Sequence, residues 1–133
     1  MSADAAVYLD SSALVKLVVE EPESKALSAH LRGRPQRVSC ALARVEVLRT
    51  IAPQGASAVT RARQLLARVS LLRLDDVLLD EAALLDGPRI RSLDAIHLAS
   101  ARALGDDLRE VITYDQRMAA AAERLGLTVA APR

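Results

Sequence analysis

The chain has 133 residues, of which 51% are hydrophobic, and its formal net charge at pH 7 is +1. This length suits one domain spanning residues 1–133 with its own hydrophobic core. The single cysteine excludes an internal disulfide, the scarcity of aromatic residues argues against RNA-binding modules that stack bases on rings, and no apolar run is long enough to cross a membrane.

Segments with strand-like and helix-like apolar spacing alternate along the whole chain. The predicted elements are, in order, a strand at 6–10, helices at 13–19 and 22–33, a strand at 37–41, helices at 42–52 and 56–69, a strand at 71–74, helices at 76–85 and 93–104, a strand at 110–115, a helix at 116–125 and a strand at 127–131. This alternation predicts an α/β fold with three layers, in which helices cover both faces of a central, mainly parallel sheet of four to five strands.

Two of the predicted strands end in an aspartate. Asp10 follows the apolar run AVYL, and Asp115 ends the run EVITYD. Open α/β sheets bind their ligands beyond the carboxyl ends of their strands, so both carboxylates are expected at that edge. A structural alternative exists for each, because an aspartate directly before a helix can also cap it; for the first helix, Ser11 and Ser12 are further cap candidates.

Two more acids lie beside apolar residues of predicted helices. Glu46 follows Val45, which we place on the buried face of its helix, and Asp94 lies in the first turn of a helix that Ser92 is expected to cap. A carboxylate beside a core costs desolvation energy unless a cation compensates it, and hard divalent cations take oxygen ligands. The structural alternatives are a pair between Glu46 and Arg49, and a favourable position for Asp94 at the positive end of its helix.

Between Lys25 and Leu74 basic residues are frequent, and Glu46 is the only acid. Such a segment either contacts a polyanion or solvates the outer faces of helices, and charge alone does not decide between the two. Arg61 and Arg68, on the predicted helix at 56–69, are the candidates for contacts with nucleic-acid phosphates.

His97 and Cys40 are expected to be structural rather than metal-binding or nucleophilic. No second histidine accompanies His97 at the spacing of a metal site, so it is expected to pack or to form hydrogen bonds at the edge of the core. Cys40, within a predicted strand, is expected to be a small buried residue.

Four segments together resemble the acidic motifs of PIN-domain nucleases, specifically the VapC toxins of bacterial type II toxin–antitoxin pairs. The segments are YLDSSALVKL, ARVEVLR, SLDAIHLASA and VITYDQRM, and the resemblance in order and spacing runs from about Tyr8 to Val129. The resemblance implies a PIN-like α/β/α fold and a Mg²⁺- or Mn²⁺-dependent endoribonuclease that cleaves cellular RNA.

The resemblance also implies which residues form the site. It places the catalytic, metal-binding acids at Asp10, Glu46, Asp94 and Asp115, of which the last is the least constant part of the family pattern. It carries Ser12 and Thr113 over as polar residues that support the site. With this substrate, Arg61 and Arg68 become candidate RNA contacts.

The partners implied by the resemblance are an RNA substrate, a VapB-like antitoxin that silences the site, and a second copy of the chain in a homodimer. Without a signal-peptide pattern at the N-terminus, a cytoplasmic location with no membrane partner is expected. The main alternative is a PIN-like module that binds protein or RNA without catalysis.

Two other classes with strand-end aspartates fit less well. A phospho-accepting receiver domain needs a lysine after a late strand, whereas Lys16 and Lys25 both occur early. A phosphatase of the haloacid dehalogenase type needs a second aspartate two residues after the first, and that position is Ser12.

Overall fold

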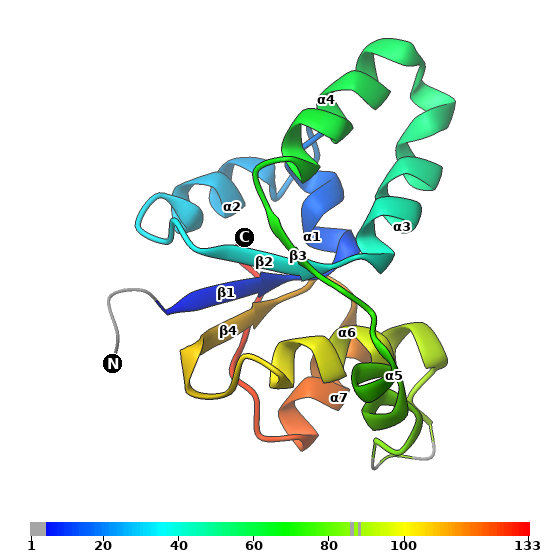
Figure 1. The fold of residues 1–133 in the computed structure, drawn as a ribbon. Coiled ribbons are helices and arrows are strands. Elements are labelled where there is room, and N and C mark those ends of the chain that lie inside the picture. Colours follow the sequence, from blue (N-terminus) through cyan, green and yellow to red (C-terminus); the bar gives the residue numbers. More distant parts are fainter. Residues whose placement is uncertain (1–4, 86, 88) are drawn as a thin grey trace.

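The protein is described by a computed structural model that covers residues 5–85, 87 and 89–133 (Figure 1). Its elements, in chain order, are β1 (Ala6–Leu9), α1 (Ser11–Lys16), α2 (Ser24–Leu31), β2 (Arg37–Cys40), α3 (Leu42–Ile51), a 3₁₀ turn η1 (Ala52–Gln54), α4 (Ala56–Leu66), β3 (Ser70–Leu72), α5 (Asp76–Ala83), α6 (Ser92–Arg102), a 3₁₀ turn η2 (Gly105–Asp107), β4 (Leu108–Ile112), α7 (Gln116–Arg124) and β5 (Val129–Ala130).

The five strands form one sheet in the order β3-β2-β1-β4-β5, and each neighbouring pair is parallel. Helices α1 to α4 lie on one face of this sheet and α5 to α7 on the other (Figure 1). The predicted α/β fold with three layers and a parallel central sheet is therefore confirmed.

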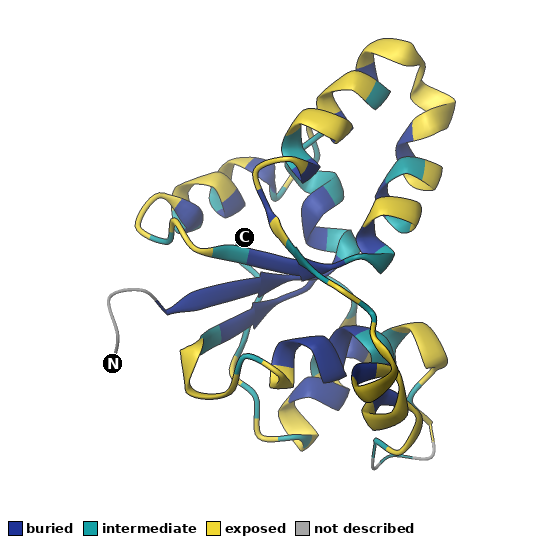
Figure 2. Cartoon of the chain, in the orientation of Figure 1, coloured by how far each residue is buried: buried dark blue, intermediate teal, exposed yellow. Residues whose placement is uncertain are grey.

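Strand β1 lies in the centre of the sheet and contributes to the core on both of its faces. Val7 and Leu9 pack with the helices of the N-terminal half, whereas Ala6 and Tyr8 point to the opposite face, toward Ala101 of α6. All four residues of β1 are buried, and the exposed residues lie on the outer sides of the helices (Figure 2). This two-sided burial explains why the sequence of β1 is a continuous apolar run.

Three local predictions were wrong. The N-cap of α1 is Asp10, whose side chain accepts a hydrogen bond from the Ala13 amide, so Ser11 and Ser12 lie inside the helix. Ser92 is the first residue of α6 rather than its cap, and the cap position has no side-chain hydrogen bond. The side chain of Val45 is 55% exposed, because α3 packs through Ala43, Val47 and Ile51 instead.

The strand that was predicted to end at Asp115 ends three residues earlier. Strand β4 ends at Ile112, so Thr113 is the first residue beyond it, and Asp115 follows two residues later as the N-cap of α7. Its carboxylate accepts hydrogen bonds from the amides of Arg117 and Met118. No helix in the described part of the chain is long and apolar enough to cross a membrane.

Candidate active site

The site begins where the two central strands end. Leu9 of β1 and Ile112 of β4 are register partners, and the Asp10 amide donates to the Ile112 carbonyl at 3.2 Å. Asp10 and Thr113, the next residues along each strand, are therefore brought side by side at the carboxyl edge of the sheet. This edge is where open α/β sheets form their binding sites.

The carboxylate of Asp10 is buried, with 3% of the residue exposed, and is held by three donors. The hydroxyl of Ser12 donates to Oδ1 at 2.6 Å, the Ala13 amide donates to Oδ1 at 3.1 Å, and the hydroxyl of Thr113 donates to Oδ2 at 2.5 Å. Burial raises the pKa of Asp10 above its usual range, although the hydrogen bonds from Ser12 and Thr113 oppose this shift. Asp10 is thus both a helix cap and a buried carboxylate held in a fixed orientation.

Ser12 and Thr113, predicted as supporting polar residues, also organise the loop after β4. The Tyr114 amide donates to the Ser12 hydroxyl at 3.0 Å, and the Asp115 amide donates to the Thr113 hydroxyl at 3.1 Å. Each hydroxyl therefore accepts from the loop and donates to Asp10. The loop that carries Asp115 is fixed by the same groups that orient Asp10.

Glu46 is part of a partly buried hydrogen-bond network rather than a pair with Arg49. The hydroxyl of Ser11 lies 2.5 Å from its Oε1, and Nε2 of His97 lies 2.7 Å from the same oxygen. On the other side of the ring, Nδ1 of His97 lies 2.8 Å from the Tyr8 hydroxyl and 3.8 Å from the Cys40 sulfur. The network fixes Glu46 between α1 and α6.

The expectation that His97 forms hydrogen bonds at the edge of the core is confirmed, but its contact with Glu46 was missed. Burial alone would lower the pKa of His97, but hydrogen bonds with Cys40 and Glu46 outweigh burial and raise it to about 10. Conversely, burial would raise the pKa of Glu46, and the hydrogen bonds from His97 and Ser11 lower it. A protonated His97 therefore faces an ionised Glu46.

Asp94 and Asp115 are linked by Arg117, a residue that the sequence analysis did not select. Nε of Arg117 lies 3.3 Å from Oδ2 of Asp94, and its Nη2 lies 3.8 Å from Oδ2 of Asp115. Asp94 stands in the first turn of α6, Asp115 caps α7, and Arg117 lies in the first turn of α7. The position of Arg117 two residues after Asp115 suggests a contact with Asp115, but no local sequence signal indicates the contact with Asp94.

A path of contacts joins all four predicted acids. Glu46 contacts Ser11, the neighbour of Asp10; Asp10 contacts Thr113; and Thr113 contacts the amide of Asp115, which shares Arg117 with Asp94. The sequence-predicted acids therefore lie around the same edge of the sheet, from β1, α3, α6 and the loop before α7.

The acids are not arranged as a metal site in the described residues, where no group of three Asp, Glu, His or Cys side chains could hold one ion. Like charges without a cation repel, and here internal cations take its place: Arg117 pairs with Asp94 and Asp115, and His97 pairs with Glu46. The donor atoms nonetheless fit the carboxylate chemistry that Mg²⁺ and Mn²⁺ require.

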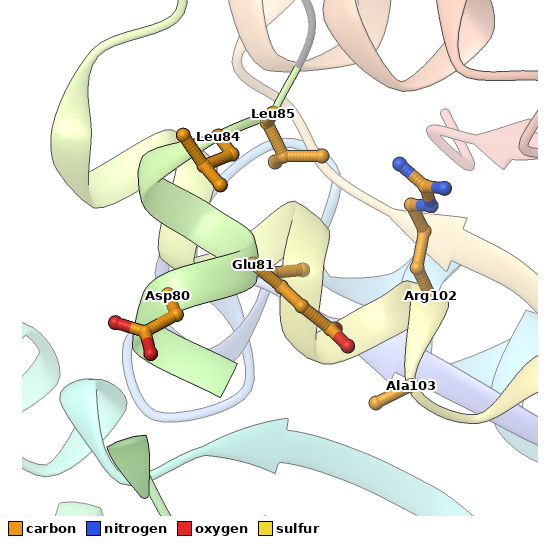
Figure 3. Close-up of a pocket in the computed structure, with 7 residues that line it drawn as sticks. Asp80, Glu81, Leu84, Leu85, Arg102 and Ala103 are labelled. Atoms are coloured by element: carbon orange, nitrogen blue, oxygen red, sulfur yellow. The ribbon is translucent and has the colours of Figure 1, made fainter. Parts of the chain in front are cut away.

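Open cavities adjoin the acids on two sides. A cavity of about 360 Å³ is lined by Ser11, Ser12 and Glu46, and another of about 280 Å³ is lined by Asp94 and Arg117. A larger cavity of about 680 Å³ lies between α5 and α6 and is lined by Asp80, Glu81, Leu84, Leu85, Ala99, Arg102 and Ala103 (Figure 3). None of the four predicted acids reaches this larger cavity.

The two candidate RNA contacts of the basic segment lie on and just after α4, which packs against α3, the helix that carries Glu46. Arg61 is exposed on α4, where its guanidinium donates to the Ser57 hydroxyl at 3.2 Å, and Arg68 is exposed just after this helix. Helix α4 lies across the sheet from α5 to α7 (Figure 1). Arg61 and Arg68 therefore remain candidates on the same face of the sheet as Glu46 and on the opposite face from α6, which carries Asp94 (Figure 1).

The sequence has clear relatives. A family model of the PIN domain matches residues 7–124. The chain is 55% identical over 128 residues to Ribonuclease VapC46 of Mycobacterium tuberculosis, an alignment that covers 96% of this chain and 98% of that protein. It is also 42% identical over 133 residues to Ribonuclease VapC35 of the same species, which covers 95% of this chain and 96% of the relative.

A solved structure shares the fold. The crystal structure of VapC20 from Mycobacterium tuberculosis, described as a toxin that cleaves the sarcin–ricin loop, matches with a TM-score of 0.76. The match covers 96% of this chain and 100% of that chain, and at 16% identity it speaks for the fold alone. By the family model and the relatives, the chain belongs to the PIN-domain ribonucleases, in their group of VapC toxins.

Proposed function

We propose that this chain is a Mg²⁺- or Mn²⁺-dependent endoribonuclease toxin, inhibited by a VapB-like antitoxin. The observation that carries the proposal is the buried, triply hydrogen-bonded Asp10 at the carboxyl edge of the sheet, joined by contacts to Glu46, Asp94 and Asp115. Burial of this carboxylate raises its pKa and therefore opposes folding at neutral pH, so a purely structural role explains it poorly. The ribonuclease names of the relatives support the same activity.

In this proposal Asp10, Asp94 and Asp115, with Glu46, hold the cation. A bound divalent ion lowers the pKa of the attacking water and stabilises the charge on the leaving oxygen. Ser12 and Thr113 keep the Asp10 carboxylate in one orientation, so that its oxygens do not have to be ordered during the reaction.

In this proposal Glu46 binds the cation or orients the attacking water. His97 and Ser11 hold Oε1, and the lowered pKa keeps the carboxylate ionised near neutral pH. An ionised carboxylate held in a fixed orientation can bind a hard divalent cation or accept a hydrogen bond from a water molecule. His97 acts through Glu46 and is assigned no contact with substrate.

The direct test is cleavage of RNA by the purified protein, assayed with Mg²⁺, with Mn²⁺ and after chelation, with mapping of the RNA ends. We expect cleavage that depends on the added cation. Binding of RNA without cleavage under all of these conditions would instead favour the alternative of a non-catalytic binding module.

The two acids that share Arg117 should differ in their importance. Asp94 is largely buried, with 13% of its side chain exposed, whereas the side chain of Asp115 is 37% exposed and also caps α7. We expect Asp94→Asn to lower cleavage at least about a hundredfold and Asp115→Asn only about tenfold, since metal clamps supply several kcal/mol. Measured kcat/KM values for the two variants test this order, and a larger loss for Asp115→Asn would contradict it.

The antitoxin would act on the same acids. A basic side chain placed among Asp94 and its neighbours neutralises carboxylates and excludes a cation, and a guanidinium is well suited to this because its fork matches carboxylate geometry. Arg117 already makes such a contact within the chain. We also propose that the protein forms a homodimer and is located in the cytoplasm. Sedimentation of the purified toxin with and without a VapB-like partner tests the homodimer and the binding of the antitoxin.

Contacts between RNA and the basic segment predict a salt effect. If Arg61 and Arg68 contact phosphates, the double variant Arg61→Glu, Arg68→Glu should weaken RNA binding and lower the slope of log K against log salt by about 1.4, or 0.7 for each lost contact to single-stranded RNA. The measurement is a binding titration at several salt concentrations. An unchanged slope would reduce these arginines to solvated surface.

A further inference from the structure

A second group of basic residues surrounds the cavity beside Asp94. This cavity, of about 280 Å³, lies between the start of α6 and α7, and its lining includes Arg89, Arg117, Arg124, Asp94, Ala120 and Ala121. Three arginines and one aspartate thus line the same cavity. The cavity begins at an acid of the proposed active site and extends away from it along α7.

The sequence of α7 builds this cavity. Arg117 and Arg124 are seven residues apart, which places them on the same face of the helix, two turns from each other. Ala120 and Ala121 lie between them on that face, and their small side chains leave room for a ligand. The helix therefore presents two arginines that are separated by the small side chains of Ala120 and Ala121.

The charges of these arginines are not equally neutralised. Arg117 is shared between Asp94 and Asp115. Arg124, at the C-terminal end of α7, has no carboxylate within 4.0 Å in the part of the chain that the structure describes. An anion placed between them would complete this arrangement, and guanidinium groups match the oxygens of a phosphate especially well.

We propose that this cavity is a subsite for an RNA phosphate that flanks the one to be cleaved, with Arg124 and Arg117 as its main ligands and Arg89 as a third. The inference rests on the proposed function, because it takes the acids beside the cavity as the place of cleavage. The subsite holds the strand by its backbone, as expected for a protein that has only two tyrosines for stacking bases. It would also give Arg117 a phosphate to bind once its carboxylates turn to the cation.

The test uses Arg124→Ala in an Asp10→Asn background, so that RNA binds without being cut. The probe is a short single-stranded oligoribonucleotide of mixed sequence, titrated at several salt concentrations in the presence of Mg²⁺. We expect affinity to fall about fivefold and the salt slope to decrease by about 0.7, as for one lost phosphate contact. Arg124→Lys should recover part of the affinity, because it keeps the charge without the fork.

The matched control is Arg102→Ala. Arg102 is an exposed arginine in the last turn of α6, and it lines the cavity of Figure 3 rather than the one beside Asp94. Its loss should leave the salt slope unchanged. An unchanged slope for Arg124→Ala, an equal decrease for Arg102→Ala, or a parent protein whose RNA binding does not depend on salt would each overturn the subsite.

Failure of the subsite and failure of the proposed function give different results. Cleavage is measured separately with the protein that keeps Asp10, where Arg124→Ala should raise KM about fivefold and leave kcat within about twofold, since a lost contact to both ground and transition state changes binding alone. Absence of any cleavage by the unmodified chain would reject the nuclease and not the phosphate contact. Cleavage with an unchanged KM would reject the contact and not the nuclease.

Discussion

Asp10→Asn is expected to abolish RNA cleavage and, at the same time, to raise the stability of the protein. A neutral amide binds a divalent cation more weakly than a carboxylate does, so we expect a loss of about a thousandfold or more in kcat/KM. Folding should improve because burial raises the pKa of Asp10, which means that the ionised form is disfavoured in the folded chain. Asparagine keeps the cap of α1 without the buried charge and should add about 1 kcal/mol, or a few degrees in Tm.

Asp75 offers a matched control for this prediction. It also follows a strand and caps a helix, since its carboxylate accepts from the Leu78 amide at 2.9 Å at the start of α5. It follows the edge strand β3, however, and takes no part in the contacts that join the four acids. We expect Asp75→Asn to leave both cleavage and Tm almost unchanged. Retained activity in Asp10→Asn, or a clear loss of its stability, would contradict the assignment of Asp10.

His97→Gln should have the second largest effect, on stability and on its dependence on pH. The pKa of about 10 for His97, compared with 6.5 for a free histidine, corresponds to at most about 5 kcal/mol of stability. Because this pKa is raised by folding, its contribution is complete below about pH 6.5 and is lost as the pH rises toward 10. The variant should therefore be less stable by a few kcal/mol near pH 6 and should approach the wild type near pH 10.

Glu46, the partner of His97, sets the lower limit of the pH range in which the charged pair stabilises the fold. Folding lowers the pKa of Glu46, so its contribution is complete above its unfolded value of 4.5 and is lost as the pH falls further. Urea unfolding of both proteins between pH 4 and pH 10 measures the difference directly. A stability difference that does not change between pH 6 and pH 10 would show that the charged pair of His97 and Glu46 does not form.

Much of the fold follows from local sequence signals. Strand β1 is a continuous apolar run, and such a run bounded by polar residues predicts a strand buried on both faces. Asp10 follows this run directly, which is why its place at the edge of the sheet could be predicted. The position of Glu46 was less certain, since the apolar residues of α3 allow two faces, and packing selected the one with Ala43 and Val47.

The contacts of the site were harder to predict because they join residues far apart in the sequence. Thr113 reaches Asp10 only because β4 lies beside β1 in the sheet, an arrangement that no local pattern specifies. His97 reaches Glu46 only because α6 packs against β2. Arg117 stands in the first turn of its helix, and no feature of the segment QRMAAAAER shows that its side chain turns to Asp94.

The proposed activity requires the acids at this edge to bind a divalent cation, Mg²⁺ or Mn²⁺, in place of their internal partners. The most direct measurement is anomalous diffraction from crystals of the protein soaked in Mn²⁺. Manganese is expected bound to Asp10 and Asp94, with the Arg117 guanidinium turned away from Asp94. Crystals in which Arg117 keeps both of its carboxylates, and in which manganese is absent from the acids at saturating concentration, would contradict it.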